Sequence, residues 1–245
     1  MIRNITKFIA VFLVIFAVFS CAKKEETPTG ESSYIKAKKL LDDKNYSEAA
    51  KEFEKIDDDF PFSKWAAKSQ NMAVYAYYKN KDYVDVVRVV DDFIRINPSN
   101  ETIPYMHYMK ALSYYEQIPD IERAQDDTRF ASATFRELIA RFPNSEYALD
   151  ARDRLIFVDE HLAGAKMAVG RYQVTQENYV GALKNFHDVV QRYSFTNQGP
   201  EAYFRLIEIY YKIGLSNEAK KLLVQMKIKF PNNEWTKTAQ RFNFE

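Results

Sequence analysis

The sequence comprises 245 residues, with 35 basic and 34 acidic side chains and 47% hydrophobic residues. This near-neutral balance argues against a nucleic-acid-binding domain, which usually carries a clear basic excess. The chain has six glycines, one cysteine and three histidines. It therefore offers little material for phosphate-binding loops and no internal disulfide, and because the histidines lack ligand spacing we expect no metal and no other cofactor.

The N-terminus has the layout of a bacterial lipoprotein signal peptide. A charged start precedes a continuous apolar segment, residues 8–19, which is shorter than the roughly 20 residues that span a membrane. Val18, Ser20 and Cys21 then match the aliphatic, small and cysteine positions of a lipobox. The sequence predicts a signal peptide over residues 1–20 and lipidation at Cys21. A plain signal peptide with a chance cysteine is the alternative.

The residues after Cys21 predict where the protein resides. Two or three acyl chains anchor a protein durably, whereas one alone is marginal. In lipoproteins of this class an aspartate after the cysteine favours the inner membrane, and here that position is Ala22, so the resemblance implies a lipid-anchored protein on the periplasmic side of the outer membrane. Residues 23–33 carry no large apolar side chain, which indicates that 21–33 form a flexible tether.

A repeated pattern runs through the rest of the chain. In each copy a small or β-branched residue is followed after four and seven positions by large apolar residues, which is the spacing of one face of a helix. The five copies span 45–61, 82–98, 127–143, 178–194 and 215–231, and all but the fourth end in proline. Proline cannot continue a helix, so it marks the end of each copy.

A second predicted helix precedes each copy, as in the tetratricopeptide repeat, which this pattern resembles. Gly214 is a helix stop, residues 117–125 are an insertion, and 146–175 form one long helical stretch. Because each helix pair has an apolar face that it cannot bury alone, the pairs stack. We expect an all-α fold, a superhelical stack of about five helix pairs over residues 34–245. A generic helical bundle with coincidental periodicity is the alternative.

The first helix of each pair lines the concave side of such a stack. The residues expected to face this groove are Tyr34, Lys38, Asn71, Tyr75, Tyr78, Tyr105, Tyr108 and Tyr115. Tyrosine offers rigid apolar area with a polar tip, which suits an extended peptide. Lys38, Lys68 or Lys110 would add a cation for a terminal carboxylate. For any single tyrosine, packing between helices is the alternative.

The whole layout resembles the BamD family of outer-membrane β-barrel assembly lipoproteins. Residues 105–112 resemble the first helix of the third repeat in that family. Residues 142–151, with Arg154 and Leu155, resemble the start of its fourth repeat. The resemblance implies a scaffold that binds the barrel-forming subunit BamA, other assembly-complex lipoproteins and unfolded outer-membrane proteins. Around the C-terminal repeats, Arg205 and Tyr211 are the residues expected to face BamA.

Other functions remain open at this point. A periplasmic repeat protein of the Tol-Pal type shares the scaffold class, although such proteins usually carry an N-terminal coiled coil, and no heptads precede the first repeat here. An enzyme of the cell wall, or its activator, is a further alternative. The sequence contains no GxGxxG, Walker, GxSxG or HExxH motif, so we expect no catalytic activity.

Overall fold

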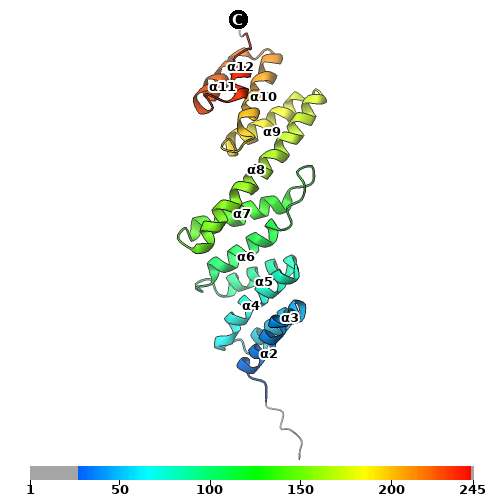
Figure 1. Ribbon diagram of the computed structural model, residues 1–245, viewed down its shortest axis with the longest axis vertical. Helices are drawn as coiled ribbons and strands as arrows, with labels where there is room; N and C mark the ends of the chain where they lie inside the picture. Colours follow the sequence, from blue (N-terminus) through cyan, green and yellow to red (C-terminus); the bar gives the residue numbers. More distant parts are fainter. Residues whose placement is uncertain (1–26, 244–245) are drawn as a thin grey trace, which may run out of the picture.

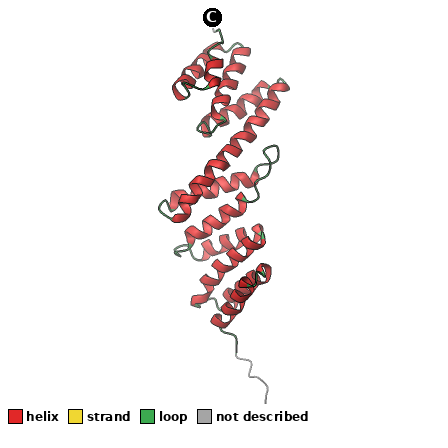
Figure 2. Cartoon of the chain, viewed as in Figure 1, coloured by secondary structure: helices red, strands yellow, loops and turns green. Residues whose placement is uncertain are grey.

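The computed structural model describes residues 27–243, and within this range every regular element is a helix (Figure 2). The helices are α2 (Gly30–Asp42), α3 (Tyr46–Asp59), α4 (Lys64–Asn80), α5 (Tyr83–Ile96), α6 (Ile103–Tyr115), α7 (Asp126–Arg141), α8 (Glu146–Thr175), α9 (Tyr179–Arg192), α10 (Gly199–Lys212), α11 (Ser216–Lys229) and α12 (Glu234–Ala239).

Consecutive helices pack in pairs, and the pairs stack along one axis from α2–α3 at one end to α10–α11 at the other (Figure 1). Each first helix of the N-terminal half also contacts the next first helix, since α2 touches α4, α4 touches α6 and α6 touches α8. The predicted all-α superhelical stack of about five helix pairs is confirmed. The short helix α12 packs on α10 and α11 and closes the C-terminal end.

The apolar face predicted for the second helices forms the core. In α3, for example, Ala49, Phe53 and Ile56 are at most 1% exposed. The corresponding residues of the other second helices are also buried, namely Val86, Val90, Phe93, Ala131, Phe135, Leu138, Ala182, Phe186, Val189, Ala219, Leu223 and Met226. The small residue at the first position lets the neighbouring helix approach, and the two large residues fill the space between pairs.

Four of the five pairs are joined by the same tight turn. One residue in each turn has a positive φ, and these residues are Lys44, Lys81, Glu177 and Gly214. The next residue donates its N–H to the carbonyl five positions earlier, over 2.8–3.0 Å, as in a Schellman motif. Gly214 is therefore the helix stop that the sequence predicted. The third pair lacks this turn because the insertion separates α6 from α7.

The start of the domain differs from the prediction. Helix α2 begins at Gly30, so four residues assigned to the tether, 30–33, belong to the first helix. Thr29 caps this helix: its side chain accepts from the Ser32 N–H over 3.1 Å, and Ser32 Oγ accepts from the Thr29 N–H over 2.9 Å. This capping box contains no large apolar residue, so a search for apolar periodicity does not find it.

Candidate functional site

A cavity of about 670 Å³ opens between the first helices α4, α6 and α8. We call it the tyrosine hollow. Its lining consists of Asn71, Met72, Tyr75, Glu101, Thr102, Tyr105, Glu146 and Tyr147. The middle of α4, the start of α6 with the loop before it, and the first turn of α8 each contribute lining residues. Three successive repeats thus build one concave site.

The tyrosines of the hollow pack through Tyr147. Its ring centroid lies 5.7 Å from that of Tyr105 and 5.3 Å from that of Tyr108, which does not itself line the cavity. Burial raises the pKa of Tyr105, so its phenol stays protonated at neutral pH. Tyr75, on α4, also lines the cavity, with 40% of its surface exposed. The hollow therefore combines flat apolar walls with hydroxyl groups at their tips.

The polar groups of the hollow are neutral or acidic. Thr102 Oγ1 donates a hydrogen bond to Asn71 Oδ1 over 3.1 Å, which fixes α4 to the start of α6. Glu101 and Glu146 add two carboxylates, and no lining residue is cationic. Such a surface suits an aromatic or aliphatic side chain and the N–H groups of an extended backbone. A free terminal carboxylate would meet two like charges.

The lysines considered for a terminal carboxylate are engaged elsewhere. Lys68 Nζ lies 4.7 Å from the centre of the Tyr34 ring, and Lys110 Nζ lies 2.5 Å from Asp91 Oδ1. Lys38 pairs with Asp42 over 3.0 Å on the exposed side of α2. None of the three lysines lines the hollow, so a cation for a terminal carboxylate stays a prediction for the groove outside it.

Tyr34 and Tyr115 are packing residues in this structure. Tyr34 is only 6% exposed and lies against the rings of Phe53 and Trp65. The Tyr115 ring meets Phe135 and Phe157 edge-on. The groove prediction is therefore wrong for Tyr34, which belongs to the core. The prediction placed both tyrosines in the groove because the repeat pattern shows which helix face a residue is on. The pattern does not show how much of that face the next helix pair buries.

Tyr78 lies on the same helix as Tyr75 but outside the hollow. Its phenol donates to Glu116 Oε1 over 3.2 Å, and burial together with this carboxylate raises the pKa of Tyr78 to about 12. Of the eight predicted groove residues, the structure brings Asn71, Tyr75 and Tyr105 into one cavity. The sequence analysis missed Tyr147, the residue that organises the aromatic wall.

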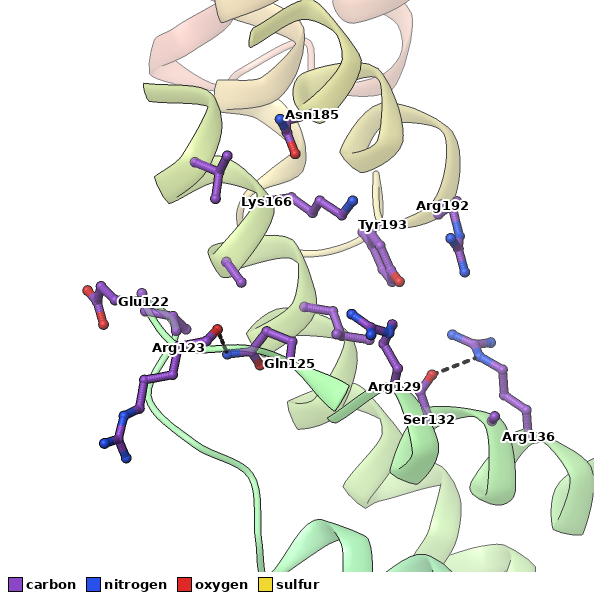
Figure 3. A pocket seen from close by; sticks show the side chains of 15 residues that line it. Glu122, Arg123, Gln125, Arg129, Ser132, Arg136, Lys166, Asn185, Arg192 and Tyr193 are labelled. Atoms are coloured by element: carbon purple, nitrogen blue, oxygen red, sulfur yellow. Dashed lines mark hydrogen bonds between the residues drawn. The ribbon is translucent and has the colours of Figure 1, made fainter. Parts of the chain in front are cut away.

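A second cavity, of about 450 Å³, lies between α7, α8, α9 and the loop before α7 (Figure 3). We call it the basic hollow. Its charged lining residues are Glu122, Arg123, Arg129, Arg136, Lys166 and Arg192. Figure 3 shows Lys166 on α8 directed toward Tyr193, and Arg129 and Arg136 on α7 below it. Five cations against one carboxylate give this cavity the opposite character to the tyrosine hollow.

Ion pairs hold several of these cations in place. Arg136 bonds to both carboxylate oxygens of Asp159 over 2.7 Å, and Lys166 pairs with Asp188 over 2.8 Å. Asp159 is buried, and burial raises the pKa of its carboxyl more than Arg136 lowers it. Arg192 lies 5.6 Å from the centre of the Tyr193 ring. Arg129 likewise pairs with Asp126. Three of the five cations are therefore matched by aspartates, and the cavity, at the junction of the third and fourth pairs, is only partly basic.

The two residues expected to face BamA lie in α10. The guanidinium of Arg205 contacts Glu201 and Glu208, and it stands 5.6 Å from the ring centres of both Phe204 and Trp235. These contacts tie α10 to α12. Tyr211, 38% exposed, lies 4.9 Å from the Phe242 ring, centroid to centroid. Arg205 therefore has a packing role at the C-terminal end, whatever it contacts in a partner.

Cys21 and the predicted signal peptide lie outside the described residues. Within residues 27–243 no helix is both long and apolar enough to cross a bilayer. The same range contains no cluster of His, Cys, Asp or Glu that is arranged to hold a metal ion.

The fold defines a class, the α-solenoid repeat proteins, in which stacked helix pairs form an extended concave surface. Comparison with known proteins identifies the family within this class. Residues 27–226 match the YfiO family, described as an outer membrane lipoprotein. The chain belongs to this family.

Three relatives carry one shared description. The chain is 37% identical over 240 residues to the outer membrane protein assembly factor BamD of Caulobacter vibrioides, covering 95% of this chain and 79% of the relative. It is 33% identical over 243 residues to BamD of Rickettsia prowazekii, covering 97% of each. BamD of Neisseria meningitidis serogroup B is 30% identical over 192 residues, which cover 74% of this chain and 72% of the relative.

Proposed function

We propose that this protein is an outer membrane protein assembly factor. It acts as a non-catalytic scaffold, anchored in the outer membrane by lipid on Cys21 and facing the periplasm. Unfolded barrel precursors bind the tyrosine hollow, and a BamA-like barrel subunit binds the C-terminal half. Family membership and the shared description of the relatives support the general role. The residue assignments rest on the geometry of the two cavities.

The tyrosine hollow is the observation that carries the precursor assignment. The segments of a barrel precursor that will become strands alternate apolar and polar residues and carry aromatic residues near the two membrane interfaces. The wall of Tyr75, Tyr105 and Tyr147 offers ring surface for one such side chain, and Glu101 and Glu146 accept from backbone N–H groups beside it. The occupant is an internal aromatic segment or a C-terminal aromatic side chain whose carboxylate points away from the hollow.

The basic hollow carries the partner assignment. Its cations, including Arg123 and Arg192, line a cavity rather than a convex surface, so a partner carboxylate entering it loses water on several sides and meets more than one donor. An acidic loop of the barrel subunit fits this site. Arg205 and Tyr211 extend the same contact toward the C-terminus.

Affinity isolation tests the general role. A C-terminally tagged full-length protein is extracted from the cell envelope with mild detergent, and the proteins that remain bound are identified by mass spectrometry. We expect a large β-barrel protein with periplasmic domains. Recovery of Tol-Pal components, or of cell-wall enzymes without any barrel protein, would assign the scaffold to another envelope system.

Peptide titration tests the tyrosine hollow. A fluorescent peptide that ends in an aromatic residue is titrated with the protein, once with a free carboxylate and once with an amidated end. Tyr75→Ala and Tyr147→Ala should each weaken binding about tenfold or more, and Tyr172→Ala, an exposed site on the same helix as Tyr147, should not. Amidation should leave affinity unchanged or improve it. Equal binding by all variants would exclude the hollow as the peptide site.

A further inference from the structure

Phe62 is the most exposed large apolar side chain in the described part of the molecule. It lies in the loop between α3 and α4, where the Ser63 N–H donates to the Phe60 carbonyl over 3.0 Å and closes a turn. Phe60 packs against the core, and Ser63 caps α4 through the Trp65 N–H. The turn is thus fixed on both sides while the Phe62 ring points into solvent.

The fold does not require an aromatic residue at this position. The equivalent residue follows the proline in the other proline-ended copies, where it is Ser99, Asn144 or Asn232. All three are polar and exposed. Because the same turn forms with a small polar residue, the Phe62 side chain contributes nothing to the loop that serine or asparagine does not supply.

The start of the described chain lies beside this turn. A Cβ atom on Gly30, the first residue of α2, would lie 3.1 Å from Trp65 Cδ1 and 3.4 Å from Ser63 Oγ. The N-terminal ends of α2 and α4 are therefore adjacent, at the end of the molecule opposite α11 and α12 (Figure 1). The chain that leads to Cys21 leaves from the same corner that carries Phe62 and Trp65.

The length of that connection limits how far this corner lies from a lipid on Cys21. Nine residue steps separate Cys21 from Gly30, and a fully extended chain covers at most about 3.3–3.6 Å per residue, or roughly 30 Å in all. Any shorter path brings the corner closer to the bilayer surface, within reach of contact. Trp is enriched at the interface between lipid headgroups and acyl chains, and Phe and Trp are typical of the apolar face of helices that lie in this interface.

The charges around the corner decide which lipid it meets. Lys64 and Lys68 lie at the start of α4, and Asp58 and Asp59 lie at the end of α3. Glu31, in the first turn of α2, adds a third anion. Two cations against three anions give the corner no attraction for anionic lipid. Insertion of an apolar ring into a zwitterionic phospholipid surface fits this composition.

We infer that the corner formed by Phe62 and Trp65 docks on the bilayer to which Cys21 is anchored, with the Phe62 ring inserted at the interface. This inference rests on the proposed lipidation of Cys21. Tether and docked corner together hold the stack at two points. They set its orientation relative to the membrane, which a flexible tether alone does not.

Site-specific fluorescence on the full-length acylated protein tests the docking. Cys21 is the only cysteine and its thiol is blocked by lipid, so a cysteine introduced by Phe62→Cys takes up an environment-sensitive dye alone. Phe195→Cys is the matched control, because Phe195 is an exposed phenylalanine in the loop between α9 and α10 near the other end of the molecule. Both proteins are reconstituted into phosphatidylcholine vesicles that contain brominated lipid in half of the samples.

We expect blue-shifted emission and quenching by brominated lipid at position 62, and neither at position 195. A second readout uses the fluorescence of Trp65 and needs no dye. In a Trp235→Phe variant that retains Phe62, brominated lipid should quench Trp65. Adding Phe62→Ser should reduce that quenching at least twofold. Protein that floats with vesicles but shows an aqueous signal at position 62 overturns the docking and leaves the anchor intact. Protein that does not float overturns the anchor and the docking together.

Discussion

The phenol of Tyr108 on α6 donates a hydrogen bond to Asp150 on α8, with 2.5 Å between Tyr108 Oη and Asp150 Oδ2. The same carboxylate accepts from Arg154, one turn further along α8. Both contacts lower the pKa of Asp150 despite its partial burial. This pair joins α6 to α8, the helices that carry Tyr105 and Tyr147, so it restrains the distance between two walls of the tyrosine hollow.

Removing this hydrogen bond should loosen the hollow. Tyr108→Phe keeps the ring contact with Tyr147 and deletes only the phenol, which should cost about 0.5–1.5 kcal/mol of unfolding free energy. Urea denaturation followed by circular dichroism measures the change. Tyr172→Phe, at an exposed position on α8, is the control and should be neutral. Equal stability of the two variants would mean that the Tyr108–Asp150 contact contributes nothing in water.

Two glycines of α8 should respond in opposite ways to alanine. A Cβ on Gly170 would lie 2.5 Å from Phe186 Cε1 and would clash with this ring, which is completely buried. We expect Gly170→Ala to destabilise by about 1–3 kcal/mol through overpacking. A Cβ on Gly164 meets only Ile121 Cγ2, at 3.7 Å, so Gly164→Ala should gain roughly 0.5–1 kcal/mol from helix propensity. Thermal unfolding of both variants, side by side, checks the prediction.

The buried carboxylate of Asp159 should make one variant sensitive to pH. Arg136→Met removes the partner that bonds to both oxygens and should cost about 1–3 kcal/mol at pH 7. Because burial raises the pKa of Asp159 in the folded state, this state binds a proton more readily than the unfolded chain. The loss should therefore shrink as the pH falls toward about 4, near the ordinary aspartate value.

A double variant tests the cause of that loss. Arg136→Met combined with Asp159→Asn removes the charge along with its partner and should recover part of the stability at pH 7. Unfolding free energies at both pH values are compared for the single and double variants. A deficit in Arg136→Met that persists unchanged at the lower pH would point to lost packing instead of an unpaired carboxylate.

The left-handed turn residues predict a reciprocal pair of effects. Gly214 adopts φ 81° and Glu177 adopts φ 56° at equivalent positions of two turns. A residue with a Cβ atom pays roughly 1–2 kcal/mol there, offset in part by the lower flexibility of its unfolded chain. Gly214→Ala should therefore destabilise and Glu177→Gly should stabilise, each by about 0.5–1 kcal/mol. Chemical denaturation resolves the sign, and destabilisation by Glu177→Gly would contradict the argument.

The repeat register could be read from the sequence because it depends on local spacing. The apolar triplets such as Ala49, Phe53 and Ile56 lie in the core as predicted, and the long helix runs from Glu146 to Thr175. These features follow from one helical period and from prolines that end each copy. Contacts between repeats cannot be predicted in the same way, because they depend on how much of each helix pair the next pair buries. No local sequence pattern gives this.

Tyr34 and Tyr147 illustrate that limit. Both are tyrosines on first helices, yet Tyr34 is buried under Trp65 and Tyr147 lines the hollow. The sequence does contain a motif that indicates the position of Tyr147. Phe-Pro-x-Ser/Asn-x-aromatic occurs three times and ends in Trp65, Tyr147 and Trp235. In each copy this aromatic residue packs on the first helix of the preceding pair, so the motif marks aromatic contacts between successive repeats.

Photo-crosslinking from inside the tyrosine hollow tests the central claim most directly. Benzoylphenylalanine replaces Tyr75, which lines the cavity, or Tyr172, which lies exposed on α8 outside it. Each protein is irradiated with an unfolded outer-membrane protein. The account predicts a crosslink from position 75 to an aromatic-containing segment of the precursor, lost when Tyr147→Ala is added, and none from position 172. Equal crosslinking from both positions, or none from position 75, would contradict it.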